Sequence, residues 1–468
     1  MEYEVRNYVQ LAFIIACSTL LSACASFSAG NLFSHYSAQN ELMHQAVKSG
    51  NYQEAEALLP DYIAGDVLDN LEKGRVYLLN EHFEESKTSF ERSDFSVREL
   101  QEQATISVSE SAASLSSLAV NDNLTTYYPA DYELGFLHLY LALNYLQEND
   151  LEGALVEVRR ANTVQERAKR EREQELESAQ NQLKNQGLSP NLGSILSQYP
   201  DAGDTLKAVQ NSYLLLLSAL LYEADGDLNS AYVDYRRALA VEPNNPQIVE
   251  GAKRVARRLG MDSDLKKLEK RYGVTRPLSR NEARVIILEE QGVVSSLAEW
   301  KQSLPLFDRH GRGVLYSIAL PYYPSQSKQG YSPLALNDVP LISAPLTDVN
   351  LMAQKNLTER MPAIVIRQVL RVWAKDQIRR QAAKDNDVGN ILFNVWNVLT
   401  EQADTRSWLT LPGQVRSSSA VIQAGEQVME VAGKRYEFNV SGGGTVLVWV
   451  SRQGNSATIW HKQLGNIR

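Results

Sequence analysis

Residues Ala219 to Pro243 read ALLYEADGDLNSAYVDYRRALAVEP, and this stretch decides the fold of the N-terminal half. Gly226-Asp227-Leu228 separates two runs whose apolar residues recur with the period of an α-helix, which predicts a helical hairpin with its bend at Gly226. Small residues at Ala219 and Ala231 allow the two helices to approach closely, while aromatic side chains such as Tyr235 fill the space around the contact. The second helix is expected to end before Pro243.

The same turn signal recurs earlier in the chain, each time between runs with the helical period, at Gly50-Asn51-Tyr52, Asn80-Glu81-His82-Phe83 and Asn149-Asp150-Leu151. The small and aromatic residues around these bends have spacings that resemble the tetratricopeptide repeat, a hairpin of two antiparallel helices. The residues expected to pack the helices together are Gly74, Tyr77, Phe90, Ala142, Tyr145, Ala154, Ala219, Tyr222, Ala231, Tyr235, Ala238 and Pro243.

Residues 40–271 are therefore expected to form a mainly α, irregular tetratricopeptide-like helical solenoid. The unequal spacing of the bends predicts inserted helical material after the second unit and again at Gln165 to Gln186. This second insertion has many charge pairs three and four apart, which indicates a solvated extension of a helix; a partner-binding coiled coil is the alternative. The resemblance implies a groove that binds segments of other proteins. Alternatively, the repeats only pack against the C-terminal half.

The N-terminal segment indicates export. An apolar stretch from Tyr8 to Leu21 has the length of a signal-peptide core, and Leu21-Ser22-Ala23-Cys24 resembles the lipobox of bacterial lipoproteins. We therefore expect residues 1–23 to be a signal peptide, Cys24 to carry covalent lipid and residues 24–39 to be a tether. Glu2 and Glu4 depart from the usual positive start of such signals. The alternatives are an ordinary secretory signal or a short core helix.

Strand-like runs dominate after residue 276. We expect an α+β region with long helices at 276–410, with strands at 284–288 and 313–320 and Pro362 opening a long helix. Residues 411–468 are expected to form a small antiparallel β-sandwich, with Gly442-Gly443-Gly444 as a hairpin turn. The strands expected in this module are 415–422, 435–440, 445–450 and 457–460.

Three segments carry a wider resemblance, namely Ala403 to Pro412, Glu289 to Val293 and Ala319 to Tyr322. In these the chain resembles a family of uncharacterised proteobacterial lipoproteins with tetratricopeptide-like N-terminal halves. The resemblance implies an envelope lipoprotein without a settled activity, whose genes often accompany those of lipoprotein activators of penicillin-binding proteins. Ala25, which follows the lipidated cysteine, implies by resemblance to enterobacterial lipoproteins that the protein is sorted to the outer membrane.

Composition argues against several classes of function. A net charge of -9 without a basic stripe disfavours nucleic-acid binding, and both cysteines, Cys17 and Cys24, precede the folded part. The six histidines lack the spacing of metal ligands, so we expect no metal, no catalytic residues and no cofactor beyond the covalent lipid. The closest approach to a site is Asp404, Arg406 and Trp408, interpreted as a structural ion pair beside a core tryptophan.

The sequence therefore predicts a lipid-anchored, periplasm-facing protein of the outer membrane that acts as a scaffold in envelope assembly or wall synthesis. Its partners would be periplasmic or envelope proteins bound through the repeat groove, and only the lipid would touch the membrane. One alternative is a wall-active or polysaccharide-handling protein in which Asp404 and Glu289 converge in an open cleft near Trp408. Another is a structural subunit of a large envelope machine.

Overall fold

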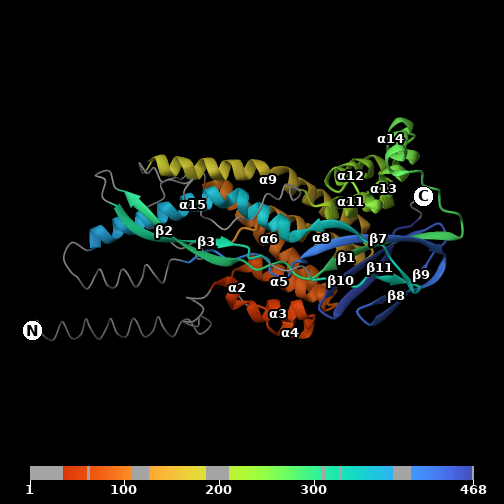
Figure 1. Cartoon of the computed structure of the whole chain (residues 1–468), viewed down its shortest axis with the longest axis horizontal. Helices are drawn as coiled ribbons and strands as arrows, with labels where there is room; N and C mark the ends of the chain where they lie inside the picture. Colours follow the sequence, from red (N-terminus) through yellow and green to blue (C-terminus); the bar gives the residue numbers. More distant parts are fainter. Residues whose placement is uncertain are drawn as a thin grey trace, which may run out of the picture.

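The computed structural model describes residues 35–60, 64–107, 126–185, 210–307, 313–325, 329–382 and 402–465. It confirms the division into an N-terminal helical region and a C-terminal region of strands (Figure 1). The helices before residue 273 are α2 (Tyr36–Gln39), α3 (Glu41–Ser49), α4 (Tyr52–Ala57), α5 (Asp66–Leu79), α6 (Phe83–Ser107), α8 (Asp131–Gln147), α9 (Leu151–Asn185), α11 (Ser212–Asp225), α12 (Leu228–Val241), α13 (Pro246–Arg258) and α14 (Asp262–Tyr272).

All four predicted bends join consecutive helices. Gly50 and Gly226 end α3 and α11 in the left-handed conformation that glycine adopts without strain, and Glu81 and Asn149 adopt positive φ angles at the other two bends. At the last of these bends Asp227 caps α12, because its Oδ1 accepts a hydrogen bond from Ser230 N at 3.1 Å. Each bend thus follows from residues within a few positions of it.

The helices form a row in which each one packs against the helix before it, from α3 to α14. Pro243 lies in the short turn after α12, and Asn245 then caps α13 with Pro246 at its first turn. The row begins earlier than expected, because Tyr36 of α2 is buried in the same hydrophobic core as α5 and α8. The predicted tether therefore does not extend to residue 39. Residues 1–34, which include the predicted signal peptide and Cys24, lie outside the described residues.

The C-terminal strands form two packed sheets and one separate hairpin. One sheet has the order β11-β10-β1-β7-β6, a second has the order β5-β4-β8-β9, and β2 pairs with β3. Their bounds are β1 (Glu282–Gln291), β2 (Ala298–Phe307), β3 (Gly313–Tyr322), β4 (Ala335–Leu336), β5 (Val339–Pro340), β6 (Ala344–Asp348), β7 (Gln414–Gln423), β8 (Gly425–Val431), β9 (Lys434–Val440), β10 (Thr445–Gln453) and β11 (Ser456–Gln463).

The strand runs are where the sequence placed them, but their pairing differs from the prediction. β1 lies between β7 and β10 and runs parallel to β10, so the sheet is mixed, and it combines strands from both sides of the predicted boundary at 411. Gly442-Gly443-Gly444 is not a hairpin turn, because β9 and β10 belong to different sheets. Because β1 and β10 lie far apart in the sequence, no short stretch of sequence predicts that they pair.

The five-stranded sheet is the middle of three layers. Along β10, Val446, Val448 and Val450 face the four-stranded sheet, while Leu447 and Trp449 belong to the core shared with the helices. Side chains alternate between the two faces of a strand, so burial of both faces explains the continuous apolar run of this strand. The helical row and the second sheet therefore hold the central sheet from opposite sides.

A long arm extends from this body, formed by α9, by α15 (Val349–Ala382) and by the β2–β3 hairpin (Figure 1). α9 is continuous, as the predicted helical extension requires, but it is not fully solvated: Ala179 and Leu183 pack in one core with residues of α15. The charged helix is thus paired within the chain. Pro362 lies inside α15, which starts thirteen residues earlier at Val349, where Asp348 Oδ1 accepts a hydrogen bond from Leu351 N at 3.1 Å. Within the described ranges, no helix has the length and apolarity needed to cross a bilayer.

Candidate functional site

A segment without helix or strand runs along the side of the helical row that faces the central sheet, which we call the inner side. We call this segment, Ala403 to Pro412, the strap; it precedes β7 and contains the predicted cluster around Trp408. Trp408 has no exposed surface, and its ring lies 5.7 Å from the rings of both Phe90 and Tyr140. Phe90 belongs to α6 and Tyr140 to α8, so the strap is anchored between two successive helical hairpins. The helical row thus binds a peptide segment of its own chain.

Two buried glutamates hold the main chain of the strap. Glu72 of α5 accepts hydrogen bonds from Leu409 N at 2.6 Å and from Thr410 N at 3.2 Å. Glu133 of α8 accepts one from Trp408 N at 2.7 Å. Three successive N–H groups of the strap therefore donate to glutamate side chains, in place of the backbone carbonyls that would accept from them in a β-sheet.

Burial sets the electrostatics of these two glutamates. It raises the pKa of Glu72 to about 8, against the lowering effect of the hydrogen bonds from Thr410 and Leu409, and it also raises the pKa of Glu133. Tyrosine hydroxyls surround both groups: Tyr36 donates to Glu72 at 3.3 Å, and Tyr127 donates to Glu133. Every oxygen of the two carboxyl groups accepts at least one hydrogen bond, although Glu133 also lies in the wall of a partly open cavity.

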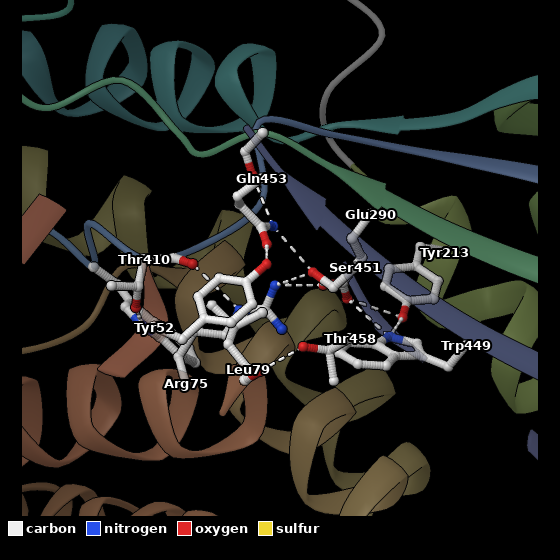
Figure 2. A network of polar contacts seen from close by, with 12 residues as sticks. Tyr52, Arg75, Leu79, Tyr213, Glu290, Thr410, Trp449, Ser451, Gln453 and Thr458 are labelled. Atoms are coloured by element: carbon white, nitrogen blue, oxygen red, sulfur yellow. Dashed lines mark hydrogen bonds and ion pairs between the residues drawn. The ribbon is translucent and has the colours of Figure 1, made fainter. Parts of the chain in front are cut away.

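A second network joins the helices, the strap and the central sheet (Figure 2). Nη2 of Arg75, on α5, lies 2.5 Å from Oε2 of Glu290 on β1, and neither side chain has exposed surface. Arg75 also donates to Ser451 Oγ at 2.8 Å and to Thr410 O at 3.2 Å. The guanidinium is 4.7 Å from the centre of the Tyr140 ring. One arginine thus connects three parts of the fold.

The other oxygen of Glu290 is also satisfied. Oε1 of Glu290 accepts from Tyr213 OH at 3.1 Å and from Trp449 Nε1 at 3.2 Å, so α11 and β10 join the same network (Figure 2). Desolvated charges cost several kcal/mol each unless they are paired. Here both oxygens of Glu290 and the Nε and Nη2 atoms of Arg75 are paired, while Nη1 of Arg75 has no hydrogen-bond partner among the described residues. The arrangement fixes the helical row against the sheet and offers no reactive group to solvent.

The predicted cluster of Asp404, Arg406 and Trp408 contains an ion pair and a buried tryptophan. Arg406 Nη2 lies 2.7 Å from Asp404 Oδ2, with the arginine side chain 7 % exposed and the aspartate 29 % exposed. Both residues line a partly open cavity of about 320 Å³ beside Glu133, but Glu289 does not; it pairs with Arg452 at 2.5 Å. The convergence of Asp404 and Glu289, on which the wall-active alternative depended, is absent from the described residues.

The predicted packing residues lie mostly in the interfaces between helices. A Cβ on Gly74 would stand 2.6 Å from the Phe90 ring, so α5 and α6 are in direct contact there. Tyr77, Tyr145 and Pro243 are half-buried. Buried side chains are found at Phe90, Ala142, Ala154, Ala219, Tyr222, Ala231, Tyr235 and Ala238.

Sequence reasoning missed the four residues that organise the site. Glu72 and Arg75 stand on the face of α5 that also carries Leu68, Leu71 and Leu79, and charges on an apolar face are the signal that could have revealed them. Glu290 is the second residue after the apolar run of β1. Glu133 stands three residues after Ala130, at the spacing of a capping box, and accepts from Ala130 N at 2.8 Å.

The outer side of the row carries a hollow of about 730 Å³, which we call the α6 hollow. It runs along α6 between α5, α8 and α9, on the face of α6 directed away from Phe90. Phe95 lies in its wall with 55 % of its side chain exposed. The charged residues that line it have both signs: Asp66, Asp69, Glu91, Asp94, Glu99 and Glu157 against Lys73, Arg92, Arg98 and Arg160.

Comparison with known protein families and with curated proteins found no match. Two solved structures of MamA are similar over half of the chain. One, a mutant form of MamA, is 13% identical, covers 50% of this chain and 92% of its own, and has a TM-score of 0.27. The other, MamA MSR-1 C2, is 12% identical, covers 50% of this chain and 95% of its own, and has a TM-score of 0.25. Likeness at this level carries no conclusion about the present chain.

Proposed function

We propose that this chain is a protein-interaction scaffold whose tetratricopeptide-like helical row binds an extended segment of a partner protein in the α6 hollow. The observation that carries the proposal is the strap: on its inner side the row already binds a non-helical segment of its own chain, by side-chain contacts to successive N–H groups. Because the strap fills the inner side, a partner has to bind elsewhere on the row. The outer α6 hollow is large enough for several residues of a peptide.

The residues that line the α6 hollow indicate which side chains the bound segment of the partner should carry. Its carboxylates and cations come from α5, α6 and α9, and some of them pair with one another, as Arg160 does with Asp94 and Glu157. A lining of both signs favours a segment that also carries both signs of charge. Phe95, at 55 % exposure, offers an aromatic contact of the kind that contributes strongly to binding energy at protein interfaces. We therefore expect a charged segment with an apolar residue opposite Phe95.

The proposed site of action is the inner face of the outer membrane, with lipid on Cys24 as the anchor. The support is the sequence Leu21-Ser22-Ala23-Cys24 after an apolar stretch of signal-peptide length. A tethered scaffold meets membrane and periplasmic partners at a raised effective concentration, so a moderate affinity in the α6 hollow suffices. Proteins of wall synthesis or envelope assembly are the proposed partners.

Site-specific photocrosslinking in intact cells tests the partner surface. A photoreactive phenylalanine analogue replaces Phe95 in one variant and Val233, which is 56 % exposed on α12, in the matched control. We expect a discrete envelope protein to be crosslinked from position 95 and not from position 233. Equal capture at the two positions, or none at position 95, would contradict the proposal. Capture of a second copy of this chain would instead support the structural-subunit alternative.

The anchor is tested separately. Cells fed an alkyne-labelled palmitate should label the wild type and leave Cys24→Ser unlabelled, and only the wild type should fractionate with outer membranes. Labelling that survives in Cys24→Ser would remove the anchor from the proposal. The crosslinking result at position 95 would still stand, so the lipid anchor and the partner-binding surface are tested independently.

A further inference from the structure

A pocket rich in arginine lies at the junction of α13, the linker before β1 and the loop between β9 and β10. It has a volume of about 250 Å³, and we call it the arginine pocket. Its wall includes Pro277, Leu278 and Gly443. The arginines that line it are Arg254, Arg257, Arg258, Arg276, Arg280 and Arg284. None of its lining residues belongs to the strap, to the contacts of Arg75 with Glu290 and Ser451, or to the α6 hollow.

Carboxylates compensate part of the positive charge of these arginines. Arg254 forms a two-pronged pair with the buried Glu223 at 2.6 and 2.7 Å, and Arg258 reaches the same carboxylate at 3.4 Å. Arg276 pairs in the same way with Glu282 at 2.6 and 2.7 Å.

The remaining pairs leave a positive surplus. Arg257 lies 3.0 Å from Glu269, and Glu250 of the pocket wall lies 2.6 Å from Lys253. Among these described groups, six arginines and the neighbouring Lys253 stand against four carboxylates, a difference of three positive charges in a chain whose net charge is -9.

Arg284 is one of the arginines in the wall of this pocket. Its Nη1 atom is buried and has no hydrogen-bond partner in the part of the chain that the structure describes. Burial, followed by the positive charge of Arg254, lowers the pKa of Arg284 to about 10. An arginine that stays charged at neutral pH with a buried donor unsatisfied is costly, unless an anion completes the site.

We propose that the arginine pocket binds a phosphate monoester, with Arg284 at its base and the exposed Arg280 at its entrance contacting the phosphate oxygens. The planar guanidinium presents paired N–H donors that match the oxygens of phosphate. A phosphate monoester carries close to two negative charges at neutral pH, which suits a surplus of three better than a single carboxylate does. Pro277 and Leu278 offer apolar contact for the rest of a small ligand.

Calorimetric titration of the full chain tests the proposal. Inorganic phosphate and glycerol 3-phosphate are titrated at constant ionic strength, with chloride as the reference anion. We expect saturable binding that weakens roughly tenfold or more in Arg284→Gln and by a smaller factor in Arg280→Gln. The matched control is Arg435→Gln, since Arg435 is exposed and pairs with Glu437 on the surface; this variant should bind as the wild type does.

A vesicle-binding experiment shows whether the phosphate belongs to a lipid headgroup or to a soluble molecule. Binding to phosphatidic acid vesicles but not to phosphatidylcholine vesicles, with dependence on Arg284, would indicate a lipid headgroup. Binding of glycerol 3-phosphate without vesicle binding would indicate a soluble metabolite. Absence of saturable binding in every arm, or binding that survives both Arg284→Gln and Arg280→Gln, would overturn the proposal.

A folding control excludes a trivial loss of binding. Because Nη1 of Arg284 finds no hydrogen-bond partner among the described residues, Arg284→Gln should melt at the same temperature as the wild type or above it in chloride. It should also lack the additional rise in melting temperature that phosphate gives the wild type, beyond the general stabilising effect of that salt. An equal rise in both proteins would count against the proposal.

Discussion

Arg75 and Glu290 stand 215 positions apart in the sequence, yet their side chains meet at 2.5 Å with no exposed surface on either. This pair joins the first long helix of the row to the central strand of the sheet. Its other contacts, to Ser451 and to Thr410 of the strap, make the helical and sheet regions parts of one folded unit.

Arg75→Met should strongly destabilise the protein, by about 3–5 kcal/mol, because Glu290 would remain buried without its cation. Denaturant unfolding followed by circular dichroism measures the change. Arg75→Met combined with Glu290→Gln should recover part of the loss, since no isolated charge is then buried. Arg435→Gln, at a surface pair, should change stability by less than about 1 kcal/mol. A loss from Arg75→Met as small as that of Arg435→Gln would contradict the assigned role.

The raised pKa of Glu72 predicts a specific pH dependence of stability. In the unfolded chain this carboxyl titrates near pH 4.3, whereas in the folded protein its pKa is about 8. Between these values the folded protein retains a proton that the unfolded chain has lost, so the free energy of unfolding should fall as pH rises from about 5 to 8. Glu72→Gln does not titrate and should show a shallower slope over this range.

The control for that experiment is Glu282→Gln. Its partner Arg276 holds the pKa of the Glu282 carboxyl at about 2, so its titration lies below the range measured. The slope between pH 5 and 8 should therefore match that of the wild type. Identical slopes for Glu72→Gln and wild type would show that Glu72 does not titrate in this window.

Two helical glycines should respond in opposite directions to alanine. A Cβ on Gly74 would meet the Phe90 ring at 2.6 Å, so Gly74→Ala should cost about 1–3 kcal/mol through overpacking. Gly135 in α8 has nothing within 4 Å of the added Cβ, so Gly135→Ala should stabilise by about 0.5–1 kcal/mol through helix propensity. Thermal melts of the two variants provide the comparison. A similar shift for both would argue against close contact of α5 with α6.

Removal of the strap tryptophan should loosen the strap from the helical row. Trp408→Ala deletes a side chain with no exposed surface and should cost about 3–5 kcal/mol. Trp408→Phe keeps the aromatic contact with Phe90 and Tyr140 and should cost clearly less. Hydrogen exchange at Leu409 and Thr410 should rise in the alanine variant. Unchanged exchange there would mean that the two glutamates hold the strap without the tryptophan.

Local features of the chain were predictable from sequence. The four bends and the predicted strand runs depend on neighbours within a few residues, and each was found at its expected place. The Asp404–Arg406 pair, only two residues apart, was likewise within reach of sequence reasoning. The start of α15 was not: Pro362 is tolerated inside this helix, which packs against α9 and β3.

The sequence by itself determined the helical hairpins of the first half and the positions of several long strands, because periodicity and turn chemistry act over short distances. The tertiary structure alone decided that β1 pairs in parallel with β10, that the strap fills the inner side of the row, and that Arg75 meets Glu290. Each of these joins segments that are more than a hundred residues apart, and the free energy that selects them comes from burying and pairing groups together. No short window of sequence contains both partners.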